Sequence, residues 1–295
     1  MEAAMGIINS FIPEEPTVQA VIDFLEAVRR SNRRKKREQI ERRLELALRK
    51  AFKEQGKQFA RGLSRFRNRF TEAAQIKSAF GDEQIILDES IPPAEWMFVW
   101  HIVAQKTAGL LGKPIEAAAQ AAMLQGAGNL IADLGMKISF TLKNPRAIAY
   151  LDEYGARQVA NINETTRDYI QTIMVKSADE GWSYDRTAEA IAERFTEFAV
   201  GKPQAHIDSR AHLIAVTEAG NAALEGQMIV AQDLQDAGIE MEKKWSTIGD
   251  DRVTDGCRAN EAEGWIALNK EFSSGHQRPL RFPGCRCDLL TRAKD

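Results

Sequence analysis

Apolar side chains recur at helical spacing over the first part of the chain. Between Arg29 and Arg69 the pattern predicts an amphipathic basic helix, or a pair of helices, because apolar residues return every three or four positions in a segment without proline. We expect this apolar stripe to pack on another part of the protein. Its expected members are Ile40, Leu44, Leu46 or Ala47, Ala51, Phe52, Phe59, Leu63, Phe66 and Phe70.

The middle of the chain is rich in alanine and other small residues and is also helical in pattern. Residues 93–142 predict two or three helices, and Asn144–Pro145 is typical of the start of another. Breaks between these helices are expected at Gly109, at Gly112–Lys113–Pro114 and at Gly135.

A further helix is predicted from about Ile207 to Asp236, with Gly238 as its C-terminal stop. The predicted buried stripe of this helix consists of Leu213, Val216, Gly220, Ala223, Leu224, Met228, Ala231 and Leu234.

The last 55 residues follow a different pattern. Residues 241–248, centred on Trp245, predict a strand, residues 264–268 a second one, and residues 283–290 a final one. Cys285 and Cys287 are two apart, so they would share one face of that final strand. The expected fold is therefore mainly α, with elongated helical N-terminal and middle regions and a small C-terminal α+β module. We divide the chain into a basic amphipathic helical arm (1–80), a helical middle region (81–145) and a C-terminal unit of helices followed by the β module (146–295).

Charge adds a strong asymmetry to this picture. The chain of 295 residues has a net charge of −2, but residues 29–69 hold 17 basic and four acidic residues. Such a segment is either a solvated helix face or a surface for an acidic partner, nucleic acid or protein. No base-reading motif accompanies it, so only nonspecific DNA contact is expected. The residues expected to make electrostatic contact are Arg33, Arg34, Lys35, Lys36 and Arg37.

No secretory or membrane-spanning segment is predicted. The N-terminus has neither a basic region nor a long apolar stretch, and the most apolar later stretch, residues 114–135, contains Glu116 and Asp133.

All three cysteines fall in the last 39 residues, which argues against a secreted disulfide framework and for reduced thiols. Cys257, Cys285 and Cys287 with His276 would form a chemically sound zinc set, although Cys-x-Cys is tighter than the usual zinc-ligand spacing. The alternatives are three small buried thiols or a cross-link at Cys257. No signature of a cysteine nucleophile is present, so no enzyme is expected. The sequence establishes no cofactor, and a structural zinc ion is one interpretation of these four residues.

Four segments of the C-terminal half follow one another in order: RAHLIAVTEAGNAALEG, KKWSTIGDDRVTDGC, GWIALNKEF and PGCRCDLL. In this order they resemble the Mu F-type family of phage head morphogenesis proteins. The resemblance covers about residues 147–292 and departs at Phe282, where the family often has a histidine before the proline. The matching positions are Thr217, Glu218, Trp245, Asp251, Arg252, Cys257, Gly264, Phe272, Cys285, Arg286 and Cys287.

The resemblance implies a minor head protein of a tailed phage or prophage that acts in procapsid assembly near the portal vertex. Its implied partners are the portal protein and other head proteins, capsid or scaffold, and its implied location is the virion, with the host cytoplasm during assembly. It implies no enzymatic role. Two other classes stay open: a nonspecific DNA-binding protein that uses the basic helix, and a cysteine- or metal-dependent hydrolase that uses the C-terminal cluster.

Overall fold

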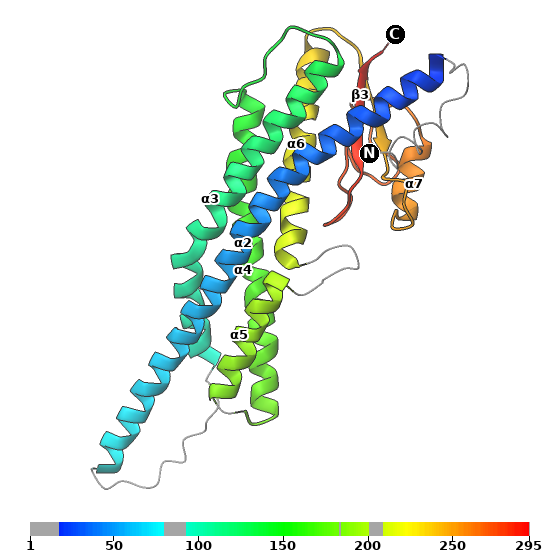
Figure 1. The fold of residues 1–295 in the computed structure, drawn as a ribbon. Helices are drawn as coiled ribbons and strands as arrows, with labels where there is room; N and C mark the ends of the chain where they lie inside the picture. Colours follow the sequence, from blue (N-terminus) through cyan, green and yellow to red (C-terminus); the bar gives the residue numbers. More distant parts are fainter. Residues whose placement is uncertain (1–17, 80–92, 183, 201–208, 295) are drawn as a thin grey trace, which may run out of the picture.

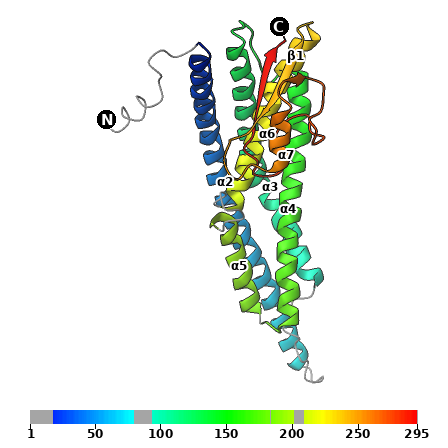
Figure 2. The same cartoon turned by 90° about the vertical axis from the view of Figure 1, so that its right-hand side faces the viewer.

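The protein is an elongated bundle of helices with a small sheet near one end (Figures 1 and 2). The computed structural model describes residues 18–79, 93–182, 184–200 and 209–294. Within these ranges it has six helices and three strands, which confirms the mainly α fold with a small C-terminal α+β module. The helices are α2 (Val18–Ala79), α3 (Pro93–Asp133), α4 (Pro145–Asp179), α5 (Tyr184–Val200), α6 (Arg210–Asp236) and α7 (Asp255–Ala262), and the strands are β1 (Met241–Ser246), β2 (Ile266–Ala267) and β3 (Asp288–Ala293).

The basic segment forms one continuous helix, α2, rather than a pair. Its apolar stripe packs against α3, α5 and α6. The stripe passes through Leu48, which is fully buried, and Leu46 points to solvent with 53% of its area exposed. The reason is the four-residue step from Leu44 through Leu48 to Phe52, which keeps these side chains on one helix face. The side chains of Phe66 and Phe70 lie outside the described part of the chain.

Helix α3 is also continuous, so the breaks predicted at Gly109 and at Gly112–Lys113–Pro114 are wrong. Pro114 lacks the N–H that an interior helical residue donates, and this usually breaks or kinks a helix. Here Leu111 and Ile115, on either side of it, are both fully buried in the bundle core. Packing therefore holds the helix through the proline. The break at Gly135 is confirmed, because α3 ends at Asp133 and Gly135 has a φ of +63°.

Hydrogen bonds tie the start of α4 to the end of α6. Asn144 caps α4 by accepting a bond from the backbone N–H of Arg146, and its own amide donates to Asp233 at 2.7 Å. Arg146 also forms ion pairs with Asp233 and Asp236. The predicted helix entry at Asn144–Pro145 is thus confirmed, and so is the predicted end of α6 at Asp236, with Gly238 at a φ of +90°.

Small residues allow α3 and α6 to cross at close range. Gly126 of α3 lies against the backbone of Ala223, and Gly226 of α6 lies against the backbone of Met123. The alanines buried in this crossing are Ala119, Ala122, Ala219, Ala222 and Ala223. Because α3 belongs to the middle region and α6 to the C-terminal unit of the sequence-based division, this crossing joins the two.

The C-terminal module is a three-stranded antiparallel sheet in the order β2–β1–β3, with α7 beside it. Lys243 of β1 pairs with Ile266 on one side and Thr291 on the other. The predicted strand around Trp245 is confirmed. The final strand begins at Asp288 rather than at residue 283, and helix α7 was not predicted.

Two larger clusters of buried side chains make up most of the core. One lies among α2 to α6, and the other joins the ends of α3 and α6 to the sheet, around Trp245, Cys257 and Phe272. Within the described ranges, no helix combines the length and the apolar character needed to cross a membrane.

Candidate functional site

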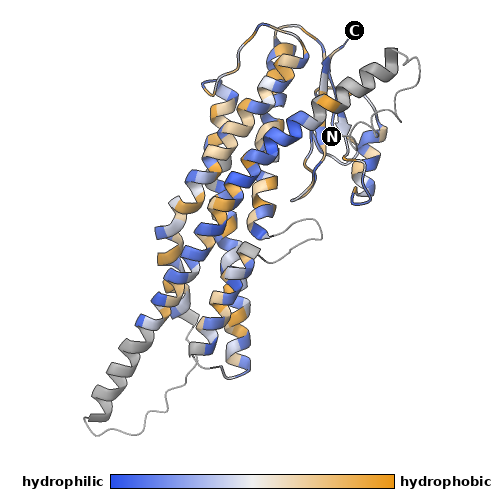
Figure 3. Ribbon diagram, in the orientation of Figure 1, coloured by the Kyte–Doolittle hydropathy of each residue, from blue (hydrophilic) through white to orange (hydrophobic). Residues whose placement is uncertain are grey.

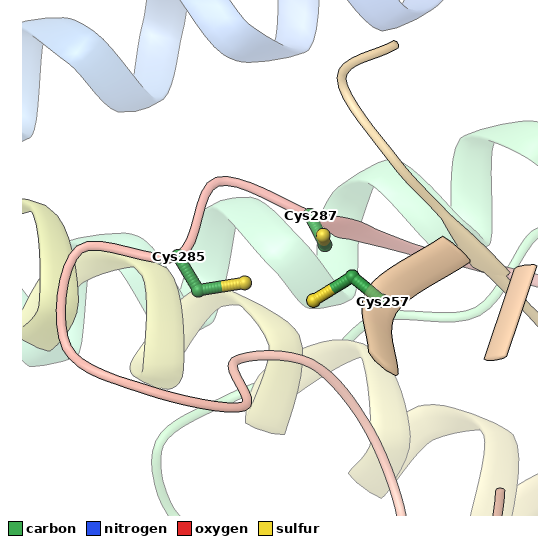
Figure 4. A group of neighbouring side chains, drawn as sticks. All are labelled: Cys257, Cys285 and Cys287. Carbon is green, nitrogen blue, oxygen red and sulfur yellow. The ribbon is translucent and has the colours of Figure 1, made fainter. Parts of the chain in front are cut away.

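The three cysteines converge at one point of the C-terminal module (Figure 4). Cys257 comes from α7, while Cys285 and Cys287 lie on the segment just before β3, not within the strand as predicted. Their Sγ atoms all lie within 4.8 Å of one another. Each side chain is at most 4% exposed, and none of them forms a disulfide. The folded chain therefore brings together the three cysteines that the sequence analysis named as candidates.

The three sulfur atoms differ in their affinity for protons. The Cys287 thiol donates a hydrogen bond to Cys285, and this bond, with further bonds from the backbone N–H groups of Cys287 and Arg281, lowers the pKa of Cys285 to about 6. The same bond to Cys285 raises the pKa of Cys287, and burial raises the pKa of Cys257. The cluster thus favours one thiolate, at Cys285, held by a neighbouring thiol.

Two polar side chains outside the cysteine set lie beside the sulfur atoms: Trp245, and Thr254, the residue before α7. Both polar groups are buried, and among the described residues neither the Trp245 indole nitrogen nor the Thr254 hydroxyl has a hydrogen-bond partner. The sequence analysis placed Trp245 at the centre of a strand and among the motif residues, and it missed Thr254.

His276 is not part of this cluster, which corrects the predicted four-residue ligand set. Its ring atom Nδ1 lies 2.8 Å from the carbonyl oxygen of Ser274 and 3.1 Å from the Ser274 hydroxyl. The tight turn at residues 272–275, closed by a backbone bond from Gly275 to Phe272, keeps the ring beside Ser274. The metal-ligating group found among the described residues is Cys257, Cys285 and Cys287.

A cavity of about 30 Å³ adjoins the cysteines. This volume corresponds to about one water molecule. Its walls are formed by Ile248, Asp250, Arg252, Val253, Thr254, Cys257, Phe282, Gly284, Cys285, Arg286 and Cys287.

Several of the motif residues hold this module in shape. The Thr217 hydroxyl accepts a 3.0 Å hydrogen bond from the backbone N–H of Gly284, so α6 fixes the turn that precedes Cys285. Trp245 is fully buried and meets Phe272 edge to face, with ring centroids 5.2 Å apart. Gly264 has a φ of +69° after α7, a conformation that favours glycine.

The remaining motif residues have other surroundings. Glu218 is buried, at 4% exposure, and lines a groove of about 540 Å³ between α4, α6 and residues 280–283. Arg252 pairs with Asp250, whereas Asp251 is exposed. Arg286 lies 4.0 Å from Glu38 of α2 and so reaches the basic helix.

The five predicted contact residues of the basic helix divide into two groups. Arg33 forms an ion pair with Asp133 at the end of α3, and Arg37 pairs with Glu41 at 3.3 Å and Asp288 at 3.8 Å. Arg34, Lys35 and Lys36 are exposed. The first group therefore faces the protein itself, and the second faces solvent.

Part of the C-terminal unit matches a known family. Residues 168–290 fit the family model described as phage Mu protein F like protein. The matched residues include α6, β1, β2, the start of β3 and the three cysteines, and this part of the chain is similar to that family. Neither the curated proteins nor the solved structures gave a match.

Proposed function

We propose that this protein is a minor head protein of a tailed phage or prophage that acts in procapsid assembly near the portal vertex. The observation that carries the proposal is the family match over residues 168–290, which includes nearly all of the C-terminal module in a head-protein region. The proposed partners are the portal protein and other head proteins, capsid or scaffold, and the proposed location is the virion.

The surface of α2 supports a role in docking to an acidic partner. Hydrophilic residues follow much of this helix in Figure 3. Because α2 packs along α3, α5 and α6, its basic side chains are presented by a rigid helix. The exposed ones include Arg34, Lys35, Lys36, Arg42, Arg43, Lys50, Lys53, Lys57, Arg61 and Arg65.

The same basic surface supports a second proposal, in which it contacts the phosphates of packaged DNA. Such binding would be nonspecific and would weaken steeply as salt rises, since each phosphate contact releases a counterion. A shift assay at two salt concentrations, with duplexes of unrelated sequence, tests this second proposal. Equal affinity for the duplexes and a steep loss with salt support it, and no binding at low salt rejects it.

We further propose a structural rather than enzymatic role for the cysteine cluster. The support is geometric: each cysteine is at most 4% exposed, and the adjoining cavity of about 30 Å³ is too small for a substrate. A hydrolase that used Cys257 would lose its activity without unfolding when this residue becomes alanine, whereas a structural residue would lower stability.

Quantitative mass spectrometry on purified mature particles and on procapsids tests the head-protein proposal. We expect the chain in at least one of the two particles, at low copy number relative to the major capsid protein. The ratio between the particles then tells whether the protein stays in the head or leaves it. Its absence from both would reject the proposal.

A further inference from the structure

The cysteine cluster has nearly the dimensions of a zinc site. In a tetrahedral site with Zn–S bonds of about 2.3 Å, the sulfur atoms lie about 3.8 Å apart. The Sγ atoms of Cys257, Cys285 and Cys287 already lie within 4.8 Å of one another. Small side-chain rotations would therefore bring the three sulfur atoms onto one ion, and the backbone could stay in place.

Two buried hydrogen-bond donors lie beside these cysteines. The Trp245 indole nitrogen and the Thr254 hydroxyl have no hydrogen-bond partner among the described residues. Metal-bound ligands are characteristically held by an outer set of hydrogen bonds, which orients the ligand and stabilises its charge. Thiolate ligands would supply the acceptors that these two donors lack.

Positive charge is also close to the cluster. Arg281 packs its guanidinium directly on Gly256, the residue before Cys257, where any larger side chain would overlap with it. Arg252 and Arg286 line the adjoining cavity, where Arg252 pairs with Asp250. One zinc ion with three thiolates carries a net charge of −1, so the guanidinium groups of Arg281 and Arg286 complement the loaded site.

We propose that Cys257, Cys285 and Cys287 bind one zinc ion as thiolates, and that a water molecule in the adjoining cavity is the fourth ligand. Binding releases the thiol protons to solvent and involves no oxidation. The ion links α7 to the segment before β3, two parts of the module far apart in sequence. This proposal is independent of the proposed head function, because it depends on the geometry of the module alone.

The first test is the zinc content of the untagged full-length chain, purified under reducing conditions and measured by inductively coupled plasma mass spectrometry. We expect about one zinc per chain, and loss of most of it in Cys257→Ser, Cys285→Ser and Cys287→Ser. His276→Ala is the matched control and keeps the metal. Loss of zinc from His276→Ala, or full zinc in Cys285→Ser, would overturn the three-thiolate set.

A second measurement covers the case in which the cysteine variants do not fold. The wild-type chain is stripped with a chelator under reducing conditions and titrated with cobalt(II), whose thiolate charge-transfer and ligand-field bands report ligand type and geometry. Thiolate bands with tetrahedral ligand-field intensity, saturating at one cobalt per chain, support the proposal. Absence of these bands, or a disulfide among the three cysteines in the freshly purified reduced protein, would overturn it.

Discussion

Gly126 of α3 lies so close to the carbonyl oxygen of Ala223 on α6 that no side chain fits between them. The arrangement is reciprocal, because Gly226 of α6 meets the carbonyl oxygen of Met123 on α3 in the same way. Two glycines, one on each helix, therefore set the distance at which the middle helix and the family-matched helix cross. The C-terminal module is placed on the bundle through this crossing.

Gly126→Ala should destabilise the protein strongly, because the added methyl group meets backbone, which cannot rotate away. We expect a loss of about 1–3 kcal/mol in the free energy of unfolding, as for other overpacked positions. Gly128→Ala in the same helix is the control, since among the described residues nothing lies within 4 Å of the place that its added methyl group would occupy. That change should stabilise the helix by about 0.5–1 kcal/mol. Urea unfolding of the two variants measures both values, and equal effects would contradict the close crossing.

The sequence pattern predicted the helices well because their apolar residues repeat at the helical period. It failed where packing overrides local preference. Pro114 is a helix breaker by its chemistry, yet α3 continues through it because Leu111 and Ile115 are buried on both sides. The local sequence pattern does not show which residues beside the proline will be buried by other helices. Leu46 is a different case, because the four-residue step from Leu44 to Phe52 is present in the sequence and already indicates Leu48 as the buried residue.

Substitutions at the predicted contact residues of α2 should fall into two classes by their effect on the free energy of unfolding. Replacing Arg33 and Arg37 by glutamine removes ion pairs to Asp133 and Asp288 that join α2 to α3 and β3, and we expect a loss of about 1–3 kcal/mol. Replacing the exposed Arg34, Lys35 and Lys36 by glutamine should change stability by less than about 0.5 kcal/mol.

Thermal unfolding of the two multiple variants at equal protein concentration measures this difference. The exposed triple variant should lose affinity for an acidic partner while it keeps its melting temperature. A drop in melting temperature for the exposed triple variant alone would contradict the assignment.

Lys243 should make stability depend on pH in the alkaline range. Burial lowers the pKa of Lys243 from 10.5 to about 8, and its Nζ donates to the backbone and side-chain oxygens of Gln277, both at 2.8 Å. Between pH 8 and 10.5 the unfolded chain binds this proton more than the folded chain does. This group therefore makes the free energy of unfolding rise with pH across that window.

The comparison with Lys243→Met isolates this effect. The difference between wild type and variant should shift in favour of wild type by about 3 kcal/mol as the pH rises through the window. Urea unfolding at several pH values measures it. Lys244→Met, at the neighbouring position of β1, is the control, and its free energy of unfolding should change with pH as that of wild type does. The prediction is contradicted if Lys243→Met shows this same dependence on pH.

Thr217→Val should loosen the turn that carries Cys285. The variant keeps the shape of the side chain but leaves the N–H of Gly284 without its acceptor, so we expect a loss of about 1–3 kcal/mol. Thr172→Val is the matched control, because the Thr172 hydroxyl also bonds a carbonyl one helical turn earlier but is exposed. Hydrogen exchange at residues 284–287 should accelerate in Thr217→Val only. Unchanged exchange there would show that Thr217 does not hold the turn.

The candidate site was predictable in its members but not in its geometry. Cysteine is rare in this chain, so Cys257, Cys285 and Cys287 stood out by composition alone. His276 stood out for the same reason, but a turn at Ser274 holds its ring elsewhere. Thr254 could not be found, because a common hydroxyl carries no signal until the fold places it beside the cysteines.

The order of strands in the sheet also has a consequence for synthesis of the protein. The central strand β1 pairs along its whole length with β3, which is translated about forty residues later. Until then one edge of β1 has no neighbouring strand, and the apolar surface around Trp245 has no cover from Leu289. A chain interrupted before Asp288 would therefore expose an unpaired edge of β1 that can pair with a strand of another chain. Translation through Ala293 is needed to complete the three-stranded sheet.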